Sequence, residues 1–328
     1  MTAMDIAIAG ATSFAVAAAM IGLYLRSGVA VALDQPNARS LHERPVPRVG
    51  GIAVAAGVCA GVAFIPWTLP LTLLGAVTLL FAVSLLDDLY GLPIVARLSI
   101  HVAAASATAW FMLGDSRGAA TVICSALAIA WMVNAYNFMD GADGIAGGMA
   151  MIGFSACAWL AHAAGEPGLA GLCLAIGAAS AGFLVFNFSP ARVFMGDAGS
   201  VPLGFLAAAL GLHGWDQGAW SLWQPLILFS LFIVDASVTL ARRVVGGERF
   251  WQAHHDHYYQ RLIRMGWSHR RTALCAYALM FGAGVISLAL SGRSDTVQAL
   301  AAAGWFAVLA TVMVAIEIRW RRRALAGV

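Results

Sequence analysis

The segment VFMGDAGS, residues 193–200, holds a single carboxylate, Asp197, between two glycines just before an apolar run. Small residues and free backbone N–H groups at the start of a helix suit phosphate oxygens. A carboxylate at the same place suits a Mg²⁺ ion that keeps several of its waters. The segment alone is weak evidence, but it indicates phosphate and magnesium chemistry when similar segments accompany it.

A second segment, NAYNFMDGADG at residues 134–144, carries polar side chains at a spacing of three residues. This spacing aligns them along one face of a helical turn, and they are Asn134, Asn137, Asp140 and Asp143. Glycines at 141 and 144 would let a bulky ligand or an irregular backbone approach closely. An ordinary Asn/Asp-Gly turn between two helices explains the glycines but not the period of three. We therefore interpret the segment as functional.

Two adjacent carboxylates, Asp87 and Asp88, close an apolar run in LLDDLYG, residues 85–91. Adjacent side chains point about 100° apart on a helix, so both can face one point only where the helix ends. Gly91 and Pro93 predict such an end. A structural role, as a cap or facing lipid headgroups, is the alternative to a catalytic one.

Histidines gather in the segment ERFWQAHHDHYYQRL, residues 248–262, where His254, His255 and His257 surround one aspartate. A structural zinc site would need a spaced second pair of ligands or a nearby cysteine, and the segment has neither. Beside arginines, these histidines favour phosphate binding instead. A solvated polar loop is the remaining alternative.

The elements that must position these segments are membrane helices. The chain has 328 residues, of which 61% are hydrophobic and 11% charged, and its mean hydropathy is +0.82. So little polar surface cannot cover a soluble globule, whereas repeated apolar runs suit a bilayer. The runs are continuous rather than alternating, which excludes a β-barrel. The fold class is therefore an all-α, polytopic membrane helical bundle.

Polar residues, glycines and prolines divide the apolar sequence into about eleven transmembrane helices. The predicted spans lie near 3–24, 49–65, 68–86, 96–113, 119–137, 144–163, 168–187, 199–213, 222–242, 272–291 and 297–318. The 199–213 span is short for a bilayer, so we expect it to be tilted, extended or buried among its neighbours. The whole chain forms one integral-membrane domain, residues 1–328.

The arginines predict the orientation of the bundle, since the chain contains no lysine. With the N-terminus outside and the C-terminus in the cytoplasm, only Arg117 and Arg293 of the nineteen basic residues fall outside. The five polar regions then all reach the cytoplasmic face, in loops near 26–48, 87–95, 138–143, 188–198 and 243–271. So many carboxylates on one face indicate a cytoplasmic active site.

In these segments and their order, the chain resembles the polyprenyl-phosphate N-acetylhexosamine-1-phosphate transferase superfamily, and more distantly phospho-MurNAc-pentapeptide translocase. The resemblance covers nearly the whole chain. It implies transfer of a sugar-1-phosphate from a UDP-amino-sugar to undecaprenyl phosphate, with release of UMP, at the start of O-antigen or related cell-envelope glycan synthesis. It also implies a Mg²⁺ cofactor, with Mn²⁺ as an alternative, a membrane-lipid environment, no nucleic-acid partner, and a homodimer as one available assembly.

The resemblance assigns roles to residues through the shared motifs. The catalytic residues would be Asp87, Asp88, Asp140, Asp143, His255 and His257. The metal ligands would be Asn137 and Asp197, and the substrate contacts Asn187, Phe194, Arg44 or Arg48, and His254. Asn187 and Phe194 resemble the family's uridine-contacting asparagine and uracil-stacking phenylalanine. The family usually has an H-x-H-H arrangement where this chain has HHDH, which leaves the separate roles of His255 and His257 open.

A metal with His and Arg donors would neutralise the diphosphate during attack. Asp87 is the first choice to accept a proton from the lipid phosphate, although a covalent phospho-aspartate is an open alternative. Two rival functions are an intramembrane aspartyl protease and a transporter or flippase that uses Asp235. Asp235 is the one charged residue well inside a predicted span. We expect its partner to be an arginine at the end of its own or a neighbouring helix, with Arg242 as the first candidate. The motifs bind the shared parts of UDP-sugars, so they do not select the sugar.

Overall fold

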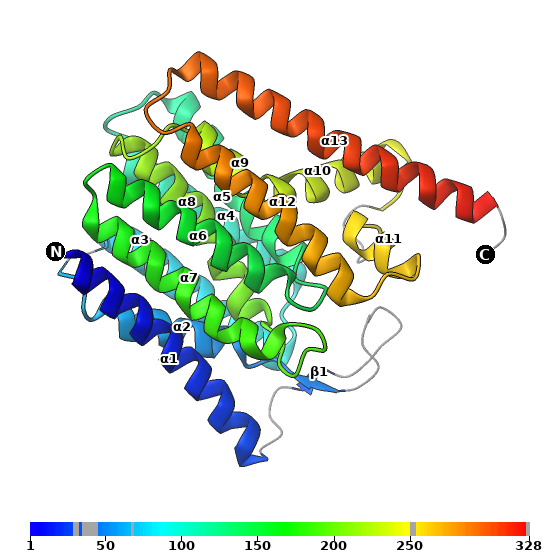
Figure 1. Ribbon diagram of the computed structural model, residues 1–328, viewed down its shortest axis with the longest axis horizontal. Helices are drawn as coiled ribbons and strands as arrows, with labels where there is room; N and C mark the ends of the chain where they lie inside the picture. Colours follow the sequence, from blue (N-terminus) through cyan, green and yellow to red (C-terminus); the bar gives the residue numbers. More distant parts are fainter. Residues whose placement is uncertain (29–32, 35–44, 67–68, 250–253, 326–328) are drawn as a thin grey trace.

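The computed structural model describes residues 1–28, 33–34, 45–66, 69–249 and 254–325. Within them the chain is a bundle of α-helices with one small hairpin, which confirms the all-α membrane class (Figure 1). The first part forms α1 (Ala3–Ser27), β1 (Leu33–Asp34), β2 (Val46–Pro47), α2 (Gly50–Val62), α3 (Leu71–Tyr90), α4 (Ile94–Leu113) and α5 (Ala119–Phe138). The second part forms α6 (Ile145–Ala163), α7 (Pro167–Asn187), α8 (Asp197–Asp216), α9 (Trp223–Leu228), α10 (Ser230–Val245), α11 (Tyr258–Arg264), α12 (His269–Ala289) and α13 (Asp295–Leu325).

Eight helices in the described residues have the length and hydropathy of a membrane span, namely α1, α3, α4, α5, α6, α7, α12 and α13. The predicted 49–65 span is a shorter helix, α2, whose 13 residues extend only about 20 Å. The number of eleven crossings and their orientation stay predictions. The start of α1 and the end of α13 lie at opposite ends of the bundle (Figure 1).

The short 199–213 span is extended and buried, two of the outcomes expected for it. Helix α8 has 20 residues, and nearly all of its side chains are covered by neighbouring helices. Small residues allow this close approach, because a Cβ on Gly204 would lie 2.7 Å from the Met132 carbonyl oxygen of α5. The first residue of α8 is Asp197, so the burial of this helix fixes the position of the carboxylate.

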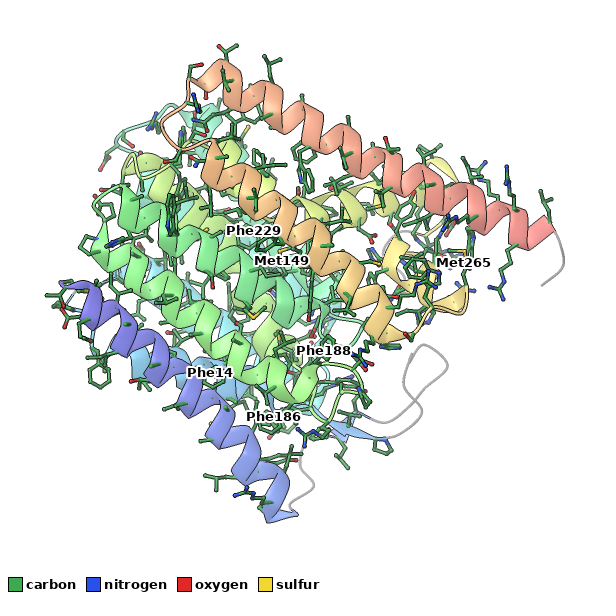
Figure 2. The ribbon with its side chains drawn as sticks, viewed as in Figure 1. Phe14, Met149, Phe186, Phe188, Phe229 and Met265 are labelled. Atoms are coloured by element: carbon green, nitrogen blue, oxygen red, sulfur yellow. The ribbon has the colours of Figure 1, made fainter. Side chains whose placement is uncertain are left out.

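The segment of the predicted 222–242 span is two helices rather than one, because the helix breaks at Phe229 between α9 and α10, and a membrane crossing there stays a prediction. Ser230 Oγ donates to the Ile227 carbonyl oxygen at 2.6 Å, and such a side-chain bond competes with the helical ladder. The Phe229 ring packs on Phe154, with ring centroids 5.5 Å apart (Figure 2). After the break, α10 leaves the common direction of the long helices (Figure 1).

One end of the bundle gathers the ends of α3, α5 and α7 with the starts of α8 and α12. The hairpin and α11 lie at this same end (Figure 1). Backbone bonds attach the hairpin and the start of α2 to the segment before α8, since Phe194 N donates to Pro47 O at 2.8 Å and Gly51 N donates to Met195 O at 2.8 Å. Gly51 must lack a side chain, because its Cβ would lie 2.3 Å from Gly199 N.

Candidate active site

The start of α8 is capped by a carboxylate from α3. Asp88 Oδ1 accepts the Asp197 N–H at 3.1 Å, and Oδ2 accepts the Ala198 N–H at 2.8 Å. The Asp88 side chain is only 3% exposed. An acidic group at a helix start accepts hydrogen bonds from N–H groups that have no partner within the helix, and the positive end of the helix dipole stabilises its negative charge. Asp88 therefore orients the Asp197 segment and holds the end of α3 against α8.

Arg97, on α4, joins the carboxylates of two other helices. Its Nη1 atom donates to Asp87 Oδ2 and, at 3.0 Å, to Asp197 Oδ2. Asp87 Oδ1 also accepts the Leu92 N–H at 2.6 Å. Both oxygens of Asp87 are thus occupied, so its role as a proton acceptor stays a prediction. Sequence reasoning counted Arg97 only for orientation, although it is the one charged residue between Asp88 and Asp115.

Asn137 reaches the same carboxylate from the last turn of α5. Its Nδ2 donates to Asp197 Oδ1 at 2.8 Å and to Ser200 Oγ at 2.9 Å. Asn134 lies elsewhere, because its side chain donates to the Ala130 carbonyl oxygen of its own helix at 2.7 Å. The prediction that all four polar side chains share one helical face is therefore wrong, because α5 ends at Phe138, before Asp140 and Asp143.

Asp140 lies in the turn after α5, beside the carboxylates of Asp88 and Asp197. Burial and then the negative charges of Asp197 and Asp88 raise its pKa well above the ordinary value. Among the described residues, no hydrogen bond or ion pair engages the Asp140 carboxylate. A cation bound between these carboxylates would relieve the repulsion among their negative charges.

These residues fit a Mg²⁺ ion through the chemistry of their donors. Four carboxylates, from Asp87, Asp88, Asp140 and Asp197, outnumber the guanidinium groups of Arg48 and Arg97. No three His, Cys, Asp or Glu side chains in the described part of the chain form a ready metal cage. Carboxylate oxygens are nevertheless donors that suit Mg²⁺, which usually takes one or two carboxylates and completes its shell with water and substrate phosphate.

Asp143 belongs to a second polar group, at the other side of the same turn. Its Oδ2 accepts the Ala191 N–H at 3.1 Å, and its Oδ1 lies 3.2 Å from His269 Nδ1 at the start of α12. Burial tends to raise the pKa of Asp143, but the hydrogen bond and charge of His269 and the Ala191 N–H outweigh it and hold the pKa below its ordinary value. Sequence reasoning missed His269, whose only signal was its position beside two arginines at a helix start.

The two predicted uridine contacts lie on the segment that links these groups. Asn187 is 4% exposed, and it receives the Gly144 N–H at 2.9 Å while donating to the Val193 carbonyl oxygen at 2.9 Å. Phe194 is half-buried, and its backbone pairs with the hairpin. Asn187 therefore ties the turn after α5 to the loop before α8, and a direct contact with uridine stays a prediction for both residues.

Arg48 faces the carboxylate cluster from the hairpin side. Its Nη2 donates to Asp34 Oδ1 at 2.6 Å, and its Nη1 lies 4.0 Å from Asp88 Oδ1. The guanidinium is 37% exposed, so it can also meet an anionic ligand. Arg44, the alternative predicted phosphate contact, lies outside the described residues.

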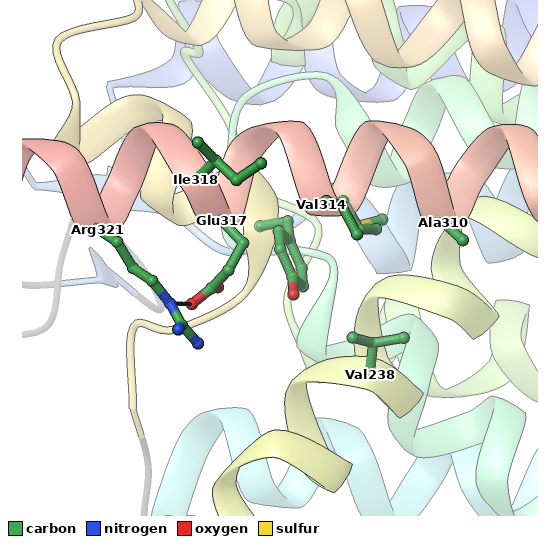
Figure 3. Close-up of a pocket in the computed structure, with 8 residues that line it drawn as sticks. Val238, Ala310, Val314, Glu317, Ile318 and Arg321 are labelled. Atoms are coloured by element: carbon green, nitrogen blue, oxygen red, sulfur yellow. Dashed lines mark hydrogen bonds and ion pairs between the residues drawn. The ribbon is translucent and has the colours of Figure 1, made fainter.

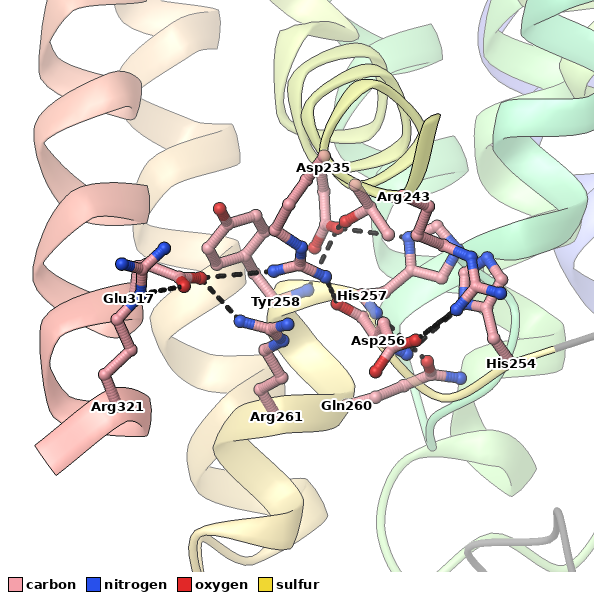
Figure 4. Close-up of polar contacts among 12 residues, drawn as sticks. Asp235, Arg243, His254, Asp256, His257, Tyr258, Gln260, Arg261, Glu317 and Arg321 are labelled. Atoms are coloured by element: carbon pink, nitrogen blue, oxygen red, sulfur yellow. Dashed lines mark hydrogen bonds and ion pairs between the residues drawn. The ribbon is translucent and has the colours of Figure 1, made fainter. Parts of the chain in front are cut away.

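The histidine segment is anchored on Asp235, whose expected pairing with Arg242 is wrong. Figure 4 shows the Asp235 carboxylate pointing from α10 to the start of α11. It accepts the N–H groups of Tyr258 at 3.0 Å and Tyr259 at 3.2 Å, and its Oδ1 lies 3.1 Å from His257 Nδ1. Arg242 instead contacts Glu317 at 3.2 Å. A helix start offers unpaired donors near the carboxylate, whereas the arginine lies two turns away.

The three histidines differ in their surroundings. His257 is 4% exposed and is held by Asp235, and its ring lies 5.8 Å from that of Phe138 at the end of α5. Burial, His257 and Arg243 lower the pKa of His254 to about 4, so this ring is neutral at pH 7. His254 Nδ1 accepts the Asp256 N–H at 3.3 Å, which places its proton on Nε2. His255 is half-exposed, and its carbonyl oxygen accepts from Arg264.

Hydrogen bonds connect this segment to the carboxylate end of the bundle. Tyr259 Oη donates to the Phe138 carbonyl oxygen at 3.0 Å, and it would collide with a Cβ on Gly141. The structure thus brings together residues from α3, α4, α5 and α8 around Asp197, with the Asp143 group and the histidine segment beside them. Clustered carboxylates with nearby guanidinium and imidazole groups can hold a divalent cation and a diphosphate.

Comparisons with known proteins point to one family. The model of glycosyl transferase family 4 matches residues 70–214. A probable undecaprenyl-phosphate N-acetylglucosaminyl 1-phosphate transferase of Bacillus subtilis is 31% identical, over 76% of this chain and 75% of its own length. The Escherichia coli K12 undecaprenyl-phosphate alpha-N-acetylglucosaminyl 1-phosphate transferase is 28% identical over 78% and 76%. The decaprenyl-phosphate N-acetylglucosaminephosphotransferase of Mycobacterium tuberculosis H37Rv is 28% identical over 75% and 72%.

Proposed function

Because the chain belongs to glycosyl transferase family 4, we propose that it transfers an N-acetylhexosamine-1-phosphate from a UDP-sugar to undecaprenyl phosphate and releases UMP. The convergence of four helices on Asp197 is the observation that carries this proposal. The printed names of the relatives make N-acetylglucosamine the first sugar to test. The product would begin a lipid-linked cell-envelope glycan on the cytoplasmic side of the inner membrane.

The reaction joins two phosphate groups and separates two others. An oxygen of the lipid phosphate attacks the phosphorus that carries the sugar, forming a new P–O–P link. The bond from that phosphorus to the bridging oxygen of the UDP-sugar breaks, and the oxygen leaves with UMP. Both reactants are anions, so the main task of the protein is to lower their mutual repulsion and align them.

Arg97 and Arg48 are the cationic side chains that we assign to this task. Arg97 lies between Asp87 and Asp197, and its Nε is buried with no hydrogen-bond partner in the described part of the chain. A phosphate oxygen that entered beside it would supply the acceptor that this Nε lacks. In this proposal Asp87 positions Arg97, and Asp88 positions Asp197 through the α8 N–H groups.

Asp197, Asn137 and Asp140 are the residues that would hold Mg²⁺. The ion would supply positive charge to the non-bridging diphosphate oxygens as negative charge shifts toward UMP. Asp197 and Asn137 are already hydrogen-bonded to each other, so binding requires only a local exchange of partners. Phe194 is assigned to the uracil ring, and His254 and His255 to phosphate oxygens.

The transporter alternative depended on Asp235, and the structure offers no support for that role. Its carboxylate accepts two backbone N–H groups and the Thr239 hydroxyl, and it is 2% exposed. A group that binds and releases ions or protons needs an open path and exchangeable partners. Asp235 therefore serves as the anchor of α11.

Release of UMP by the purified protein tests the proposed function. The assay contains undecaprenyl phosphate, Mg²⁺ and one UDP-sugar at a time from a panel of amino sugars. We expect UMP only when lipid phosphate and a suitable UDP-sugar are both present. Release of UDP instead would show simple sugar transfer, and no release with any donor would contradict the proposal.

A further inference from the structure

A groove lies on the outer side of the bundle between α10, α11 and α13. It has a volume of about 380 Å³, and Figure 3 shows its lining side chains. Its walls are mostly apolar, from Val238, Ala310, Met313, Val314 and Ile318. Val314 is 57% exposed and Ile318 is 47% exposed, so the groove opens to the surroundings of the bundle. This apolar surface has the chemistry of a site for a hydrocarbon chain.

One end of the groove lies beside a cluster of arginines, of which Arg321 lines the groove itself. Glu317 lines it and receives three guanidinium groups, from Arg242 at 3.2 Å, Arg261 at 2.5 Å and Arg321 at 2.7 Å (Figure 4). A single carboxylate cannot neutralise three arginines. Arg321 is 72% exposed, and the buried Nε of Arg261 has no hydrogen-bond partner among the residues that the structure describes. The surplus positive charge suits a phosphate group.

Aromatic rings lie beside the arginines at this end of the groove, an arrangement typical of residues at the depth of lipid headgroups. The Arg261 guanidinium lies 5.1 Å from the Trp320 ring and 5.7 Å from the Tyr258 ring, and Arg264 lies 4.9 Å from Trp320. Tyrosine and tryptophan collect at membrane–water interfaces, and basic side chains beside them interact with anionic lipid. An apolar groove that ends in such a cluster matches the two parts of a phospholipid.

We propose that this groove binds an anionic phospholipid of the bilayer, with one acyl chain along α13 and the phosphate at the arginine cluster. The site is distinct from that of the lipid acceptor. Asp235 and Thr239 are buried on the side of α10 that faces the bundle, whereas Val238, on the groove side, is 37% exposed. The groove is thus separated from the carboxylate cluster by α10 and by the start of α11.

Retention of lipid in native mass spectrometry tests this site, with protein taken from nanodiscs that contain phosphatidylglycerol and phosphatidylcholine. Arg321→Gln should weaken retention of phosphatidylglycerol about fivefold, from about 1 kcal/mol for one arginine at an anionic surface. Val314→Trp should fill the groove and lower retention at least as much. Arg322→Gln and Val308→Trp are matched controls on exposed positions of α13 outside the groove, and both should retain lipid as the wild type does.

Three results would contradict the proposal. One is equal retention of phosphatidylglycerol by the wild type, Arg321→Gln and Val314→Trp. Another is displacement of the retained phospholipid by undecaprenyl phosphate, which would assign the groove to the acceptor. Equal retention of phosphatidylcholine would likewise remove the role of the arginine cluster. Thermal unfolding of each variant establishes that it is folded, and the assay reads binding without depending on transferase activity.

Discussion

At the scale of single residues, α8 has an Asp–Arg pair at each end. Asp197 pairs with Arg97 at 3.0 Å at the site end, and Asp216 pairs with Arg117 at 3.3 Å at the other end. The two pairs have the same chemistry, but only the first lies among other carboxylates. Asp216 is therefore an internal control for the role of charge at Asp197.

Asp197→Asn should lower kcat on the order of 10²-fold, because the variant lacks the charge that binds a hard cation and balances Arg97. Asparagine keeps the size of the side chain, but its amide group leaves one of the donors Arg97 and Asn137 unpaired, so the free energy of unfolding should fall by about 1–3 kcal/mol while the variant stays folded. The measurement is UMP release across a Mg²⁺ titration, with the unfolding temperature recorded in the same detergent. Asp216→Asn should behave as the wild type, and near-normal turnover of Asp197→Asn would contradict the metal-site assignment.

Phe194→Ala should mainly raise the KM for the UDP-sugar. Stacking on a base contributes to binding of the ground state and transition state alike, by about 1–3 kcal/mol. The backbone bonds of Phe194 to the hairpin do not depend on its ring, so the loop should keep its conformation. Steady-state kinetics at saturating lipid phosphate check this, and an unchanged KM would remove Phe194 from the uridine site.

At the scale of elements, buried carboxylates and the glycine turn between α5 and α6 fix the positions of the helix ends. Asp88 ties α3 to α8, and Asp235 ties α10 to α11. Between α5 and α6, Gly144 donates to Asn187 at 2.9 Å and accepts from Tyr277 at 2.7 Å. These contacts link segments that are distant in sequence, so a change at one of them should disturb the site without touching substrate.

Asp235→Asn should reduce the free energy of unfolding by about 1–3 kcal/mol, because the new amide group faces N–H donors and leaves one of them unsatisfied. Proteolysis of the connection between α10 and α11 should also become faster. Thermal unfolding and timed proteolysis measure the two effects. Asp295→Asn is the control, since among the described residues the exposed Asp295 carboxylate accepts one hydrogen bond, from Trp223 Nε1 at 3.1 Å. Equal effects of the two substitutions would contradict the anchoring role.

Gly144→Ala and Gly165→Ala form a second matched pair, since both glycines have a φ of 80°. Each alanine should lower the free energy of unfolding by about 1–2 kcal/mol, because it must adopt a left-handed backbone conformation. Only Gly144 is crowded, because its Cβ would lie 2.8 Å from Tyr277 Oη, whereas nothing lies within 4 Å at Gly165. We expect reduced UMP release for Gly144→Ala alone. Equal activity of the two variants would show that the turn tolerates displacement of Tyr277.

At the scale of the whole molecule, the polar chemistry collects at one end of the bundle. Arg117 belongs to the turn between α4 and α5, and Arg293 to the turn between α12 and α13. Both turns lie at the end of the helices away from Asp197, since Arg117 pairs with the far end of α8. Arg117 therefore lies apart from the Asp197 end of α8, while the side of the membrane that each end faces stays a prediction.

A pair of reporter fusions tests which side of the membrane this end occupies. A reporter after Arg323 should behave as cytoplasmic, and one inserted near Asp216 should behave as external, because positively charged ends remain inside. An alkaline phosphatase and green fluorescent protein pair gives opposite signals at the two positions. The reverse result at either position would contradict a cytoplasmic active site.

The sequence by itself determined the class of fold and the chemical character of the site. Continuous apolar runs require helices in lipid, because every backbone group must be satisfied within its own segment. The motifs around Asp87, Asp140 and Asp197 predicted carboxylates at helix ends, and the family resemblance supplied a reaction. These signals are local, so they can be read without knowing which helices meet.

Only the tertiary structure decided which of these residues act together. Arg97 joins Asp87 to Asp197 across three helices, and His269 reaches Asp143 from α12. Asn134 shares the spacing of Asn137 but donates to the Ala130 carbonyl oxygen of its own helix, and α5 ends before Asp140 and Asp143. The partner of Asp235 is a helix start rather than the nearby Arg242. Such pairings depend on packing between distant segments, and the spacing of residues along one helix does not contain that information.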